Sequence, residues 1–417
     1  MDHLAILTII GGFLVFGLAS GRIQDSVLTG PMLFAAFGLI VGPAALGLVP
    51  MQIDNTVLHW LAEITLILVL FADASSIDLH RLMRDHNLPL RMLAIGMPVN
   101  IALGALAALA LFTELTIWEA ALLAAILAPT DAALGQAVVT HPAVPARIRQ
   151  ALNVESGLND GIALPLVLIF AALASASQET KQATEWLLFG LTQVTLGPVA
   201  GVAVGYLGAK LVALCNRTGW MTERAEGMVA LALAFGAFGV GEAIHGNGFI
   251  AAFIAGLTFS NALGRACRYL FEFAESEGQI LVLLTFFAFG CVMIPMTFPN
   301  IGLSACLYAL LAVTVLRMLP VSLSLLGTRI KPVTSVFLGW FGPRGLASVL
   351  FVLLILEEMG VPHKDTIFTV AITTVVLSIV LHGVTAGWAA RSYGAWCASI
   401  EECEEKRPVS EKAFEGA

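Results

Sequence analysis

Two otherwise apolar stretches of the sequence each hold a small group of oxygen-bearing side chains. In the first stretch, Thr130 and Asp131 directly follow Pro129. In the second, Ser156 and Asp160 stand four residues apart, which places them on one face of a helix. Carboxylate, hydroxyl and carbonyl oxygens are the ligands that a hard cation prefers. We therefore expect Asp160, Asp131, Ser156 and Thr130 to bind a monovalent cation of the Na+ type.

A second set of side chains indicates a structural ion pair. Glu155 and Asn159 share the neighbouring face of the same helix. A buried carboxylate needs a counter-charge, because otherwise it takes up a proton. Arg317 and Arg344 each lie inside another apolar stretch, and the sequence leaves open which of them pairs with Glu155. We assign this set to structure rather than to ion binding.

Two proline-containing segments predict broken helices. Pro129 lacks an N–H group and its ring clashes with the carbonyl group of Ala125, so a helix breaks there. Gly342 and Pro343 predict a second break in a later stretch. Interrupted hydrophobic segments in corresponding halves of a transporter point to a binding site near the middle of the membrane. Asp73, at the end of another stretch, is either an auxiliary residue in a water-filled funnel or a side chain that extends to the membrane surface.

The composition indicates what surrounds these residues. Hydrophobic residues make up 58% of the 417 residues, charged residues 12%, and the mean hydropathy is +0.90. A soluble globular protein carries about 25% charged residues, so most of this surface must meet lipid. The sequence has no glycine-lysine phosphate loop, zinc signature or acid-rich catalytic motif, and its six cysteines lack metal-site spacing. We therefore expect a secondary transporter in a lipid bilayer rather than an enzyme or a primary pump, with no cofactor and no nucleic-acid partner.

Apolar stretches bounded by charged or turn residues predict an all-α membrane protein with thirteen transmembrane helices. Their expected ranges are 3–20, 28–49, 56–73, 88–112, 115–139, 146–176, 184–214, 226–244, 247–264, 275–296, 300–326, 332–357 and 365–393. If the last six repeat the first six and the seventh connects them, the two copies enter the membrane from opposite sides. The fifth and twelfth helices then correspond, so the fold is expected to contain six-helix inverted repeats with two crossing broken helices.

The basic residues orient this topology. Most of the 21 Lys and Arg residues fall in alternate loops, and in the other loops we find Lys181 and Lys364. Loops rich in Lys and Arg stay in the cytoplasm. We therefore expect a multi-pass protein of a bacterial inner (plasma) membrane, with its N-terminus outside and its C-terminus in the cytoplasm.

In these segments the chain resembles the monovalent cation/proton antiporter family, specifically its NhaP-type sodium/proton exchanger branch. The segments that carry the likeness are Phe71-Ala72-Asp73-Ala74, Ala128-Pro129-Thr130-Asp131, Glu155-Ser156-Gly157-Leu158-Asn159-Asp160-Gly161, the helix with Arg317, and Phe341-Gly342-Pro343-Arg344-Gly345-Leu346. Each motif alone is weak, whereas their combination in this order is highly specific. Together with the predicted helices, the likeness covers nearly the whole chain.

The resemblance implies a homodimer in which a core domain moves against a dimerisation domain, in an elevator-like cycle. The division it implies is dimerisation-domain helices in 1–87, core helices in 88–180, a linker and further dimerisation-domain helices in 181–298, core helices in 299–398, and a short tail in 399–417. The charged composition of that tail predicts that it is disordered and cytoplasmic.

The resemblance also implies the activity, which is exchange of a cation for a proton by competition at Asp160. Its pairing with Asn159 is associated with electroneutral one-for-one exchange. Na+ is the expected cation, and the ligand types leave Li+ and K+ open. The main alternative is a cation-coupled carrier of an organic anion on a related fold. A channel is a further alternative, which a test of coupling between cation and proton movement distinguishes.

Overall fold

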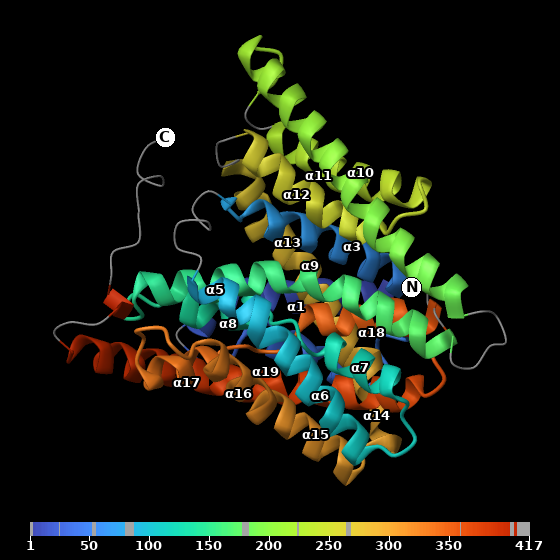
Figure 1. The fold of residues 1–417 in the computed structure, drawn as a ribbon, viewed down its shortest axis with the longest axis vertical. Helices are drawn as coiled ribbons and strands as arrows, with labels where there is room; N and C mark the ends of the chain where they lie inside the picture. The colour runs from blue at the N-terminus through green and yellow to red at the C-terminus, as the bar shows by residue number, and fades with distance from the viewer. Residues whose placement is uncertain are drawn as a thin grey trace.

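The structure is a computed structural model that describes residues 3–24, 26–51, 56–79, 87–176, 183–222, 225–263, 268–358, 360–400 and 404–406. Within these ranges every regular element is a helix (Figure 1). A helix satisfies its own backbone hydrogen bonds, which lipid cannot do. The predicted all-α membrane class is therefore confirmed.

The elements follow the predicted apolar stretches closely. The first half forms α1 (His3–Gln24), α2 (Gly30–Val41), α3 (Thr56–Ser75), α5 (Asn87–Arg91), η1 (Met92–Gly96), α6 (Met97–Leu111), α7 (Ile117–Ile126), α8 (Ala132–Val139) and α9 (Ala146–Ala176). The middle forms α10 (Ala183–Arg217), α11 (Glu226–Ala243), α12 (Gly248–Leu263), α13 (Arg268–Ala288), η3 (Phe289–Met293), α14 (Ile294–Thr297) and η4 (Phe298–Asn300). The last part forms α15 (Leu303–Val313), α16 (Val315–Ser324), α17 (Pro332–Trp340), α18 (Leu346–Glu358), α19 (Lys364–Ala398) and η5 (Glu404–Lys406).

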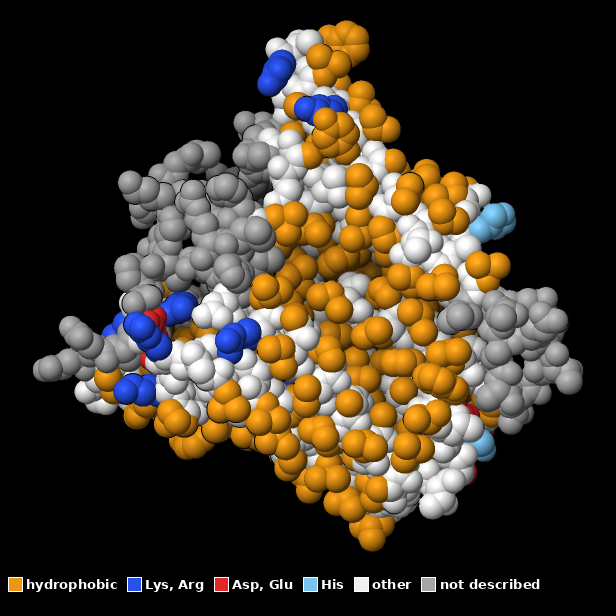
Figure 2. Space-filling model, in the orientation of Figure 1, with side chains coloured by type: hydrophobic (Ala, Val, Ile, Leu, Met, Phe, Trp, Pro, Cys, Tyr) orange, Lys and Arg blue, Asp and Glu red, His pale blue; other side chains and the backbone are white. Residues whose placement is uncertain are grey.

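Several helices are long and apolar enough to cross a membrane. Among the described residues there are nine such helices, and α2, α7 and α12 are shorter apolar helices. Hydrophobic side chains cover most of the face shown in Figure 2, as a lipid-facing surface requires. Each predicted range contains one, two or three helical elements. The number of thirteen membrane crossings itself stays a prediction.

The helices pack in two groups, with α9 between them. We call α2, α3 and α10–α13 the first group and α5–α8 with α15–α19 the second group, because members of each contact one another extensively. In Figure 1, α3 and α10–α13 lie in the upper part of the molecule, and α5–α8 with α15–α19 in the lower part. Helix α9 contacts α3, α10 and α12 on one side and α7 and α8 on the other.

The two predicted helix breaks are present and cross each other. Residues 127–131 separate α7 from α8, and residues 341–345 separate α17 from α18. At the crossing the Asp131 N–H donates to the Pro343 carbonyl oxygen at 2.8 Å. Nearby, the Ser348 hydroxyl donates to the Ile126 carbonyl oxygen at 2.7 Å, which satisfies a carbonyl group at the end of α7.

Two predicted helices differ from the prediction in their continuity. The stretch 28–49 is helical only as far as Val41, because Pro43 forces Gly42 into an extended conformation with ψ of 178°. The stretch 300–326 is interrupted at Thr314, whose φ of −116° and ψ of −99° separate α15 from α16. No proline marks this interruption, so the sequence does not reveal it.

The prediction of a disordered tail is wrong at residues 404–406. Glu405 is fully buried, and its Oε1 accepts hydrogen bonds from the Lys331 N–H and the Thr334 hydroxyl, each at 2.7 Å. Glu404 forms an ion pair with Arg147 at 2.8 Å. Glu405 thereby accepts an N–H group at the N-terminus of α17, where a carboxylate is stabilised. Most of the remaining tail lies outside the described residues.

Candidate functional site

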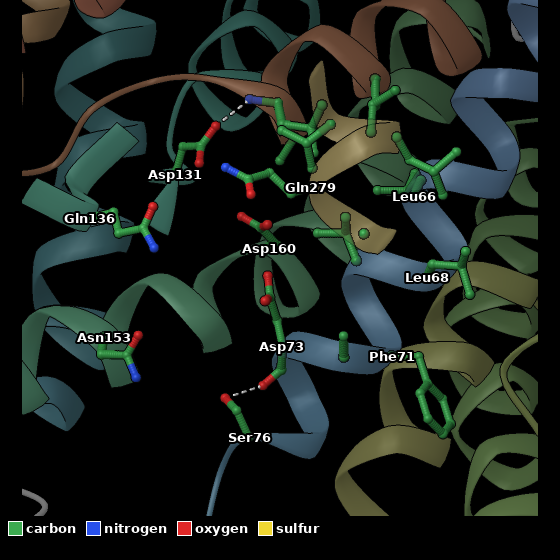
Figure 3. A pocket seen from close by; sticks show the side chains of 18 of the residues that line it. Leu66, Leu68, Phe71, Asp73, Ser76, Asp131, Gln136, Asn153, Asp160 and Gln279 are labelled. Atoms are coloured by element: carbon green, nitrogen blue, oxygen red, sulfur yellow. Dashed lines mark hydrogen bonds between the residues drawn. The ribbon is translucent and has the colours of Figure 1, made fainter. Parts of the chain in front are cut away.

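A cavity of about 440 Å³ lies where the two groups of helices meet. Its walls come from α3, α11 and α13 in the first group, from α8 and α18 in the second, and from α9. Asp73, Asp131 and Asp160 all line it. In Figure 3 the carboxyl group of Asp73 points toward Asp160, and Gln279 lies between Asp160 and Asp131. The structure therefore brings the predicted auxiliary residue together with both predicted cation-binding aspartates.

Asp131 joins the two broken helices. One carboxylate oxygen accepts a hydrogen bond from the Leu134 N–H at 3.3 Å, in the first turn of α8. The other accepts from the Leu346 N–H at 2.7 Å, at the start of α18. Helix N-termini carry unsatisfied N–H groups and a partial positive charge, so they stabilise a carboxylate at the helix break. Asp131 thus caps two half-helices while it faces the cavity.

Thr130 and Ser156 are held by hydrogen bonds between the first break and α9. The Ser156 hydroxyl donates to the Thr130 carbonyl oxygen at 2.7 Å. The Thr130 hydroxyl donates to Glu155 Oε2 at 3.1 Å and accepts from Asn159 Nδ2 at 2.5 Å. Ser156 lines a small void of about 10 Å³ beside Asp131, and neither hydroxyl residue lines the main cavity. The four predicted cation-binding residues are neighbours, but two of them stand behind the cavity wall.

Arg317 is the partner of Glu155, which answers the question that the sequence left open. Arg317 Nη1 lies 2.9 Å from Glu155 Oε1, and both side chains are only 2% exposed. Arg344 instead donates from Nη1 to the carbonyl oxygens of Ala128 and Pro129, at 2.8 and 3.2 Å. It thereby satisfies carbonyl groups that the break at Pro129 leaves without helical partners.

Asp160 is the most enclosed of the three cavity carboxylates. Its side chain lies on α9, the residue is 6% exposed, and Oδ1 has no hydrogen-bond partner among the described residues. A buried carboxylate oxygen without a donor is costly, so it favours a bound proton or a cation. Ionised carboxylates that share one cavity also repel one another, which adds to this preference. The arrangement can therefore hold a cation or a proton at Asp160.

Sequence reasoning missed several polar residues that support the site. Asn100 in α6 lies beside Arg344, with an amide oriented to donate to the Leu316 carbonyl oxygen at 2.7 Å and accept from Arg344 Nη2 at 3.2 Å. Ser378 and His382 in α19 contact the second break. The available signal was the one used for the aspartates, namely a polar or ionisable residue inside a predicted membrane helix.

Comparison with known protein families identifies the family of the chain. The family model described as sodium/hydrogen exchanger, transmembrane, matches residues 4–392. The chain belongs to the sodium/hydrogen exchanger family. This match covers both helix breaks, all three cavity aspartates and the buried Glu155–Arg317 pair. The family resemblance inferred from the motifs is confirmed.

Individual members of the sodium/hydrogen exchanger family are distant from this chain. It is 26% identical over 400 residues to the K+/H+ antiporter NhaP of Alkalimonas amylolytica, an alignment that covers 95% of this chain and 66% of the relative. It is 26% identical over 411 residues to Na+/H+ antiporter 2 of Zygosaccharomyces rouxii, covering 88% of this chain and 50% of the relative. The chain therefore spans about half to two thirds of the length of these curated relatives.

The fold has a counterpart among solved structures. The structure of the sodium proton antiporter MjNhaP1 from Methanocaldococcus jannaschii at pH 8 superimposes with a TM-score of 0.75. The alignment covers 93% of this chain and 97% of that chain, at 22% sequence identity. The architecture of this sodium/hydrogen exchanger family member, with its two broken helices, is therefore that of a known antiporter fold.

Proposed function

We propose that this chain is a secondary active antiporter that exchanges a monovalent cation for a proton across a membrane. The observation that carries the proposal is the placement of Asp160, which is buried yet lines a cavity that it shares with Asp131 and Asp73. No further chemistry is required of the protein, because one carboxylate can hold either a proton or a cation but not both at once. Competition at Asp160 then couples the two fluxes.

The coupling follows from electrostatics. An ionised carboxylate without a counter-ion is costly to move through a low-dielectric barrier, whereas a protonated or cation-loaded one carries little net charge. Both loaded states of Asp160 can therefore change their exposure, and the empty ionised state cannot do so cheaply. Each proton that leaves on one side must be replaced by a cation, which gives one-for-one, electroneutral exchange.

The other predicted residues of the site contribute to cation binding in different ways. Asp131 contributes a carboxylate that is already oriented by two helix N-termini. Ser156 and the Thr130 carbonyl oxygen, hydrogen-bonded to each other, can turn toward a cation that enters beside Asp131. Asp73 lines the cavity from α3 and raises the local concentration of cations.

The two groups of helices supply the moving parts. We assign the first group to the dimerisation domain of a homodimer and the second group, with α9, to a core domain that moves in an elevator-like cycle. The cavity extends to Ser76 and Thr140, beside loops that the distribution of Lys and Arg predicts to be cytoplasmic. In Figure 2 the visible Lys and Arg side chains gather toward the left and upper ends of the molecule. We therefore assign the structure to an inward-open state.

The proposal names Na+ as the cation to test first. The names of the two curated relatives include one Na+/H+ and one K+/H+ antiporter. Oxygen ligands serve Na+, Li+ and K+ alike, so transport must be measured with each of the three.

The test is exchange by purified protein in proteoliposomes with a preset pH gradient. Addition of Na+, Li+ or K+ should dissipate the gradient, and a clamped membrane potential should not change the rate. Asp160→Asn should reduce exchange to the level of protein-free vesicles while the protein still elutes as a single folded species. Asp365→Asn, at an exposed carboxylate in the first turn of α19, is the matched control and should exchange normally. Normal exchange by Asp160→Asn would refute the proposal.

The same vesicles test the alternative function. A carrier of an organic anion would take up that anion when a cation gradient is applied, without dissipating the pH gradient. A channel would conduct the cation with no coupling to protons. Either result would replace antiport as the activity.

A further inference from the structure

Helix α19 holds both ends of the second helix break. The Arg344 N–H, at the far end of the break, donates to the Ser378 hydroxyl at 2.6 Å. His382 Nε2 lies 2.8 Å from the carbonyl oxygen of Trp340, the last residue of α17. Ser378 and His382 are one helical turn apart, and their side chains contact each other, with Oγ 3.1 Å from Nδ1. One face of α19 therefore spans the interruption between α17 and α18.

The ring of His382 bridges Trp340 and Ser378. Its Nε2 lies 2.8 Å from the Trp340 carbonyl oxygen, and its Nδ1 lies 3.1 Å from the Ser378 hydroxyl oxygen and 2.9 Å from the Ser378 carbonyl oxygen. The Ser378 hydroxyl oxygen in turn accepts the Arg344 N–H. His382 is 1% exposed and Ser378 is fully buried, so water does not replace these bonds. The Trp340 ring is fixed as well, because its Nε1 donates to the Thr385 hydroxyl at 3.0 Å.

The residues of the second break that α19 holds also form hydrogen bonds to the first break, at Asp131 and Pro129. Pro343, between the two braced ends, accepts the Asp131 N–H. Leu346, two residues after Arg344, donates to Asp131 Oδ2. The Arg344 side chain holds the carbonyl oxygen of Pro129 in the first break. The spacing of residues 341–345 therefore decides where Asp131 stands relative to the cavity.

We propose that His382, acting through Ser378, is a positioning residue of the ion site. It holds the backbone of residues 341–345 in place, so that the hydrogen bonds of Pro343 and Leu346 keep Asp131 in its cation-binding position. This inference rests on the proposed antiport function and adds a residue that does not touch the cavity. The competing explanation is that His382 is a buried histidine that stabilises α19 and has no influence on cation binding.

The experiment compares two substitutions of one residue. His382→Leu keeps a similar volume and removes both ring nitrogens, and His382→Gln keeps an amide donor that can reach the Trp340 carbonyl group. Thr374→Val is the matched control, because Thr374 is a fully buried residue of α19 whose hydroxyl donates within its own helix, to the Val370 carbonyl oxygen at 2.7 Å. Each protein is assayed in proteoliposomes for its KM for Na+, and in detergent for the rise in unfolding temperature on titration with Na+.

We expect His382→Leu to raise the KM and the midpoint of the Na+ titration together by on the order of tenfold, the usual effect of leaving one buried hydrogen-bonding group unpaired. His382→Gln should recover most of that loss, and Thr374→Val should match the unmodified protein. A KM that stays unchanged in His382→Leu, with only a lower unfolding temperature in cation-free buffer, would overturn the inference. So would a His382→Gln protein as impaired as His382→Leu.

Two further readouts keep the outcome decisive. If His382→Leu does not fold, Ser378→Ala removes the hydroxyl group that joins His382 to the Arg344 N–H and should raise the KM in the same direction, and an unchanged KM would contradict the inference. Failure of the antiport proposal is seen separately, because the unmodified protein would then show no cation-dependent proton movement.

Discussion

Glu155 supports the ion site from behind the cavity wall. Its Oε1 pairs with the Arg317 guanidinium, and its Oε2 accepts a hydrogen bond from the Thr130 hydroxyl group. One carboxylate therefore holds both a buried arginine and a predicted cation-binding residue. Asn159, one turn further along α9, donates to the same Thr130 hydroxyl oxygen. The side chains assigned to structure thus hold the backbone of the first break against α9.

Loss of Glu155 should therefore appear first as loss of stability. Glu155→Ala leaves Arg317 buried without its counter-charge, which typically costs about 3–5 kcal/mol. We expect a large fall in the unfolding temperature of the detergent-purified protein, measured by intrinsic fluorescence, and a lower yield from the membrane fraction. The double substitution Glu155→Met with Arg317→Met removes both charges and should regain much of the lost stability. A stable Glu155→Ala protein with altered cation affinity would instead place Glu155 among the ligands.

The residue scale also shows where sequence reasoning stops. Asp131, Glu155 and Asp160 were identifiable because an ionisable group inside an apolar helix is rare. The partner of Glu155 was not, because Arg317 and Arg344 both lie in apolar stretches and the choice depends on helix packing. His382 carried the same signal as the aspartates, yet a single histidine does not reveal that it faces the end of a broken helix.

At the scale of elements, the helix breaks that could be predicted were those that a proline marks. Pro129 and Pro343 each remove a helical hydrogen bond, so both breaks were visible in the sequence. Their crossing depends on contacts between distant segments, such as that between Asp131 and Pro343. The interruption at Thr314 arises without proline or glycine and could not be foreseen. The division between transport and dimerisation domains remains a prediction that the packing of the two helix groups supports.

The turn at residues 404–406 gives a prediction about α17. Glu405 accepts hydrogen bonds at the N-terminus of α17, from Lys331 and Thr334, at a fully buried position. We expect Glu405→Ala to lower the unfolding free energy by about 1–3 kcal/mol, the cost of leaving buried donors unpaired. Glu404→Ala should cost about 0–1 kcal/mol, because its ion pair with Arg147 is partly exposed. Thermal unfolding of both variants measures the difference, and equal effects would contradict a specific cap.

At the scale of the whole molecule, α9 is the element that both helix groups share. It carries Asp160 and Glu155, and it packs on α3 and α12 as well as on α7 and α8. If the second group moves against the first, the contact between α9 and the end of α3 must change during each transport cycle. A covalent bond across that contact should therefore stop transport.

Positions 77 and 157 suit such a bond. A Cβ atom at Gly157 would lie 3.9 Å from Ile77 Cγ1, and a cysteine sulfur would take the place of that carbon atom. In a background in which the six native cysteines are replaced, Ile77→Cys with Gly157→Cys should exchange cations while reduced. Oxidation should stop exchange in proteoliposomes, and a reductant should restore it.

The control bond lies within the first group. A Cβ atom at Gly208 would lie 3.2 Å from Leu233 Cγ, whose place a cysteine sulfur would take, so Gly208→Cys with Leu233→Cys can join α10 to α11. Because these two helices do not move against each other when the second group moves as a body, oxidation of this pair should leave exchange intact. Electrophoresis without reductant confirms that each bond has formed. Full exchange by the oxidised 77–157 pair would mean that Asp160 reaches both sides of the membrane without movement of α9 against α3.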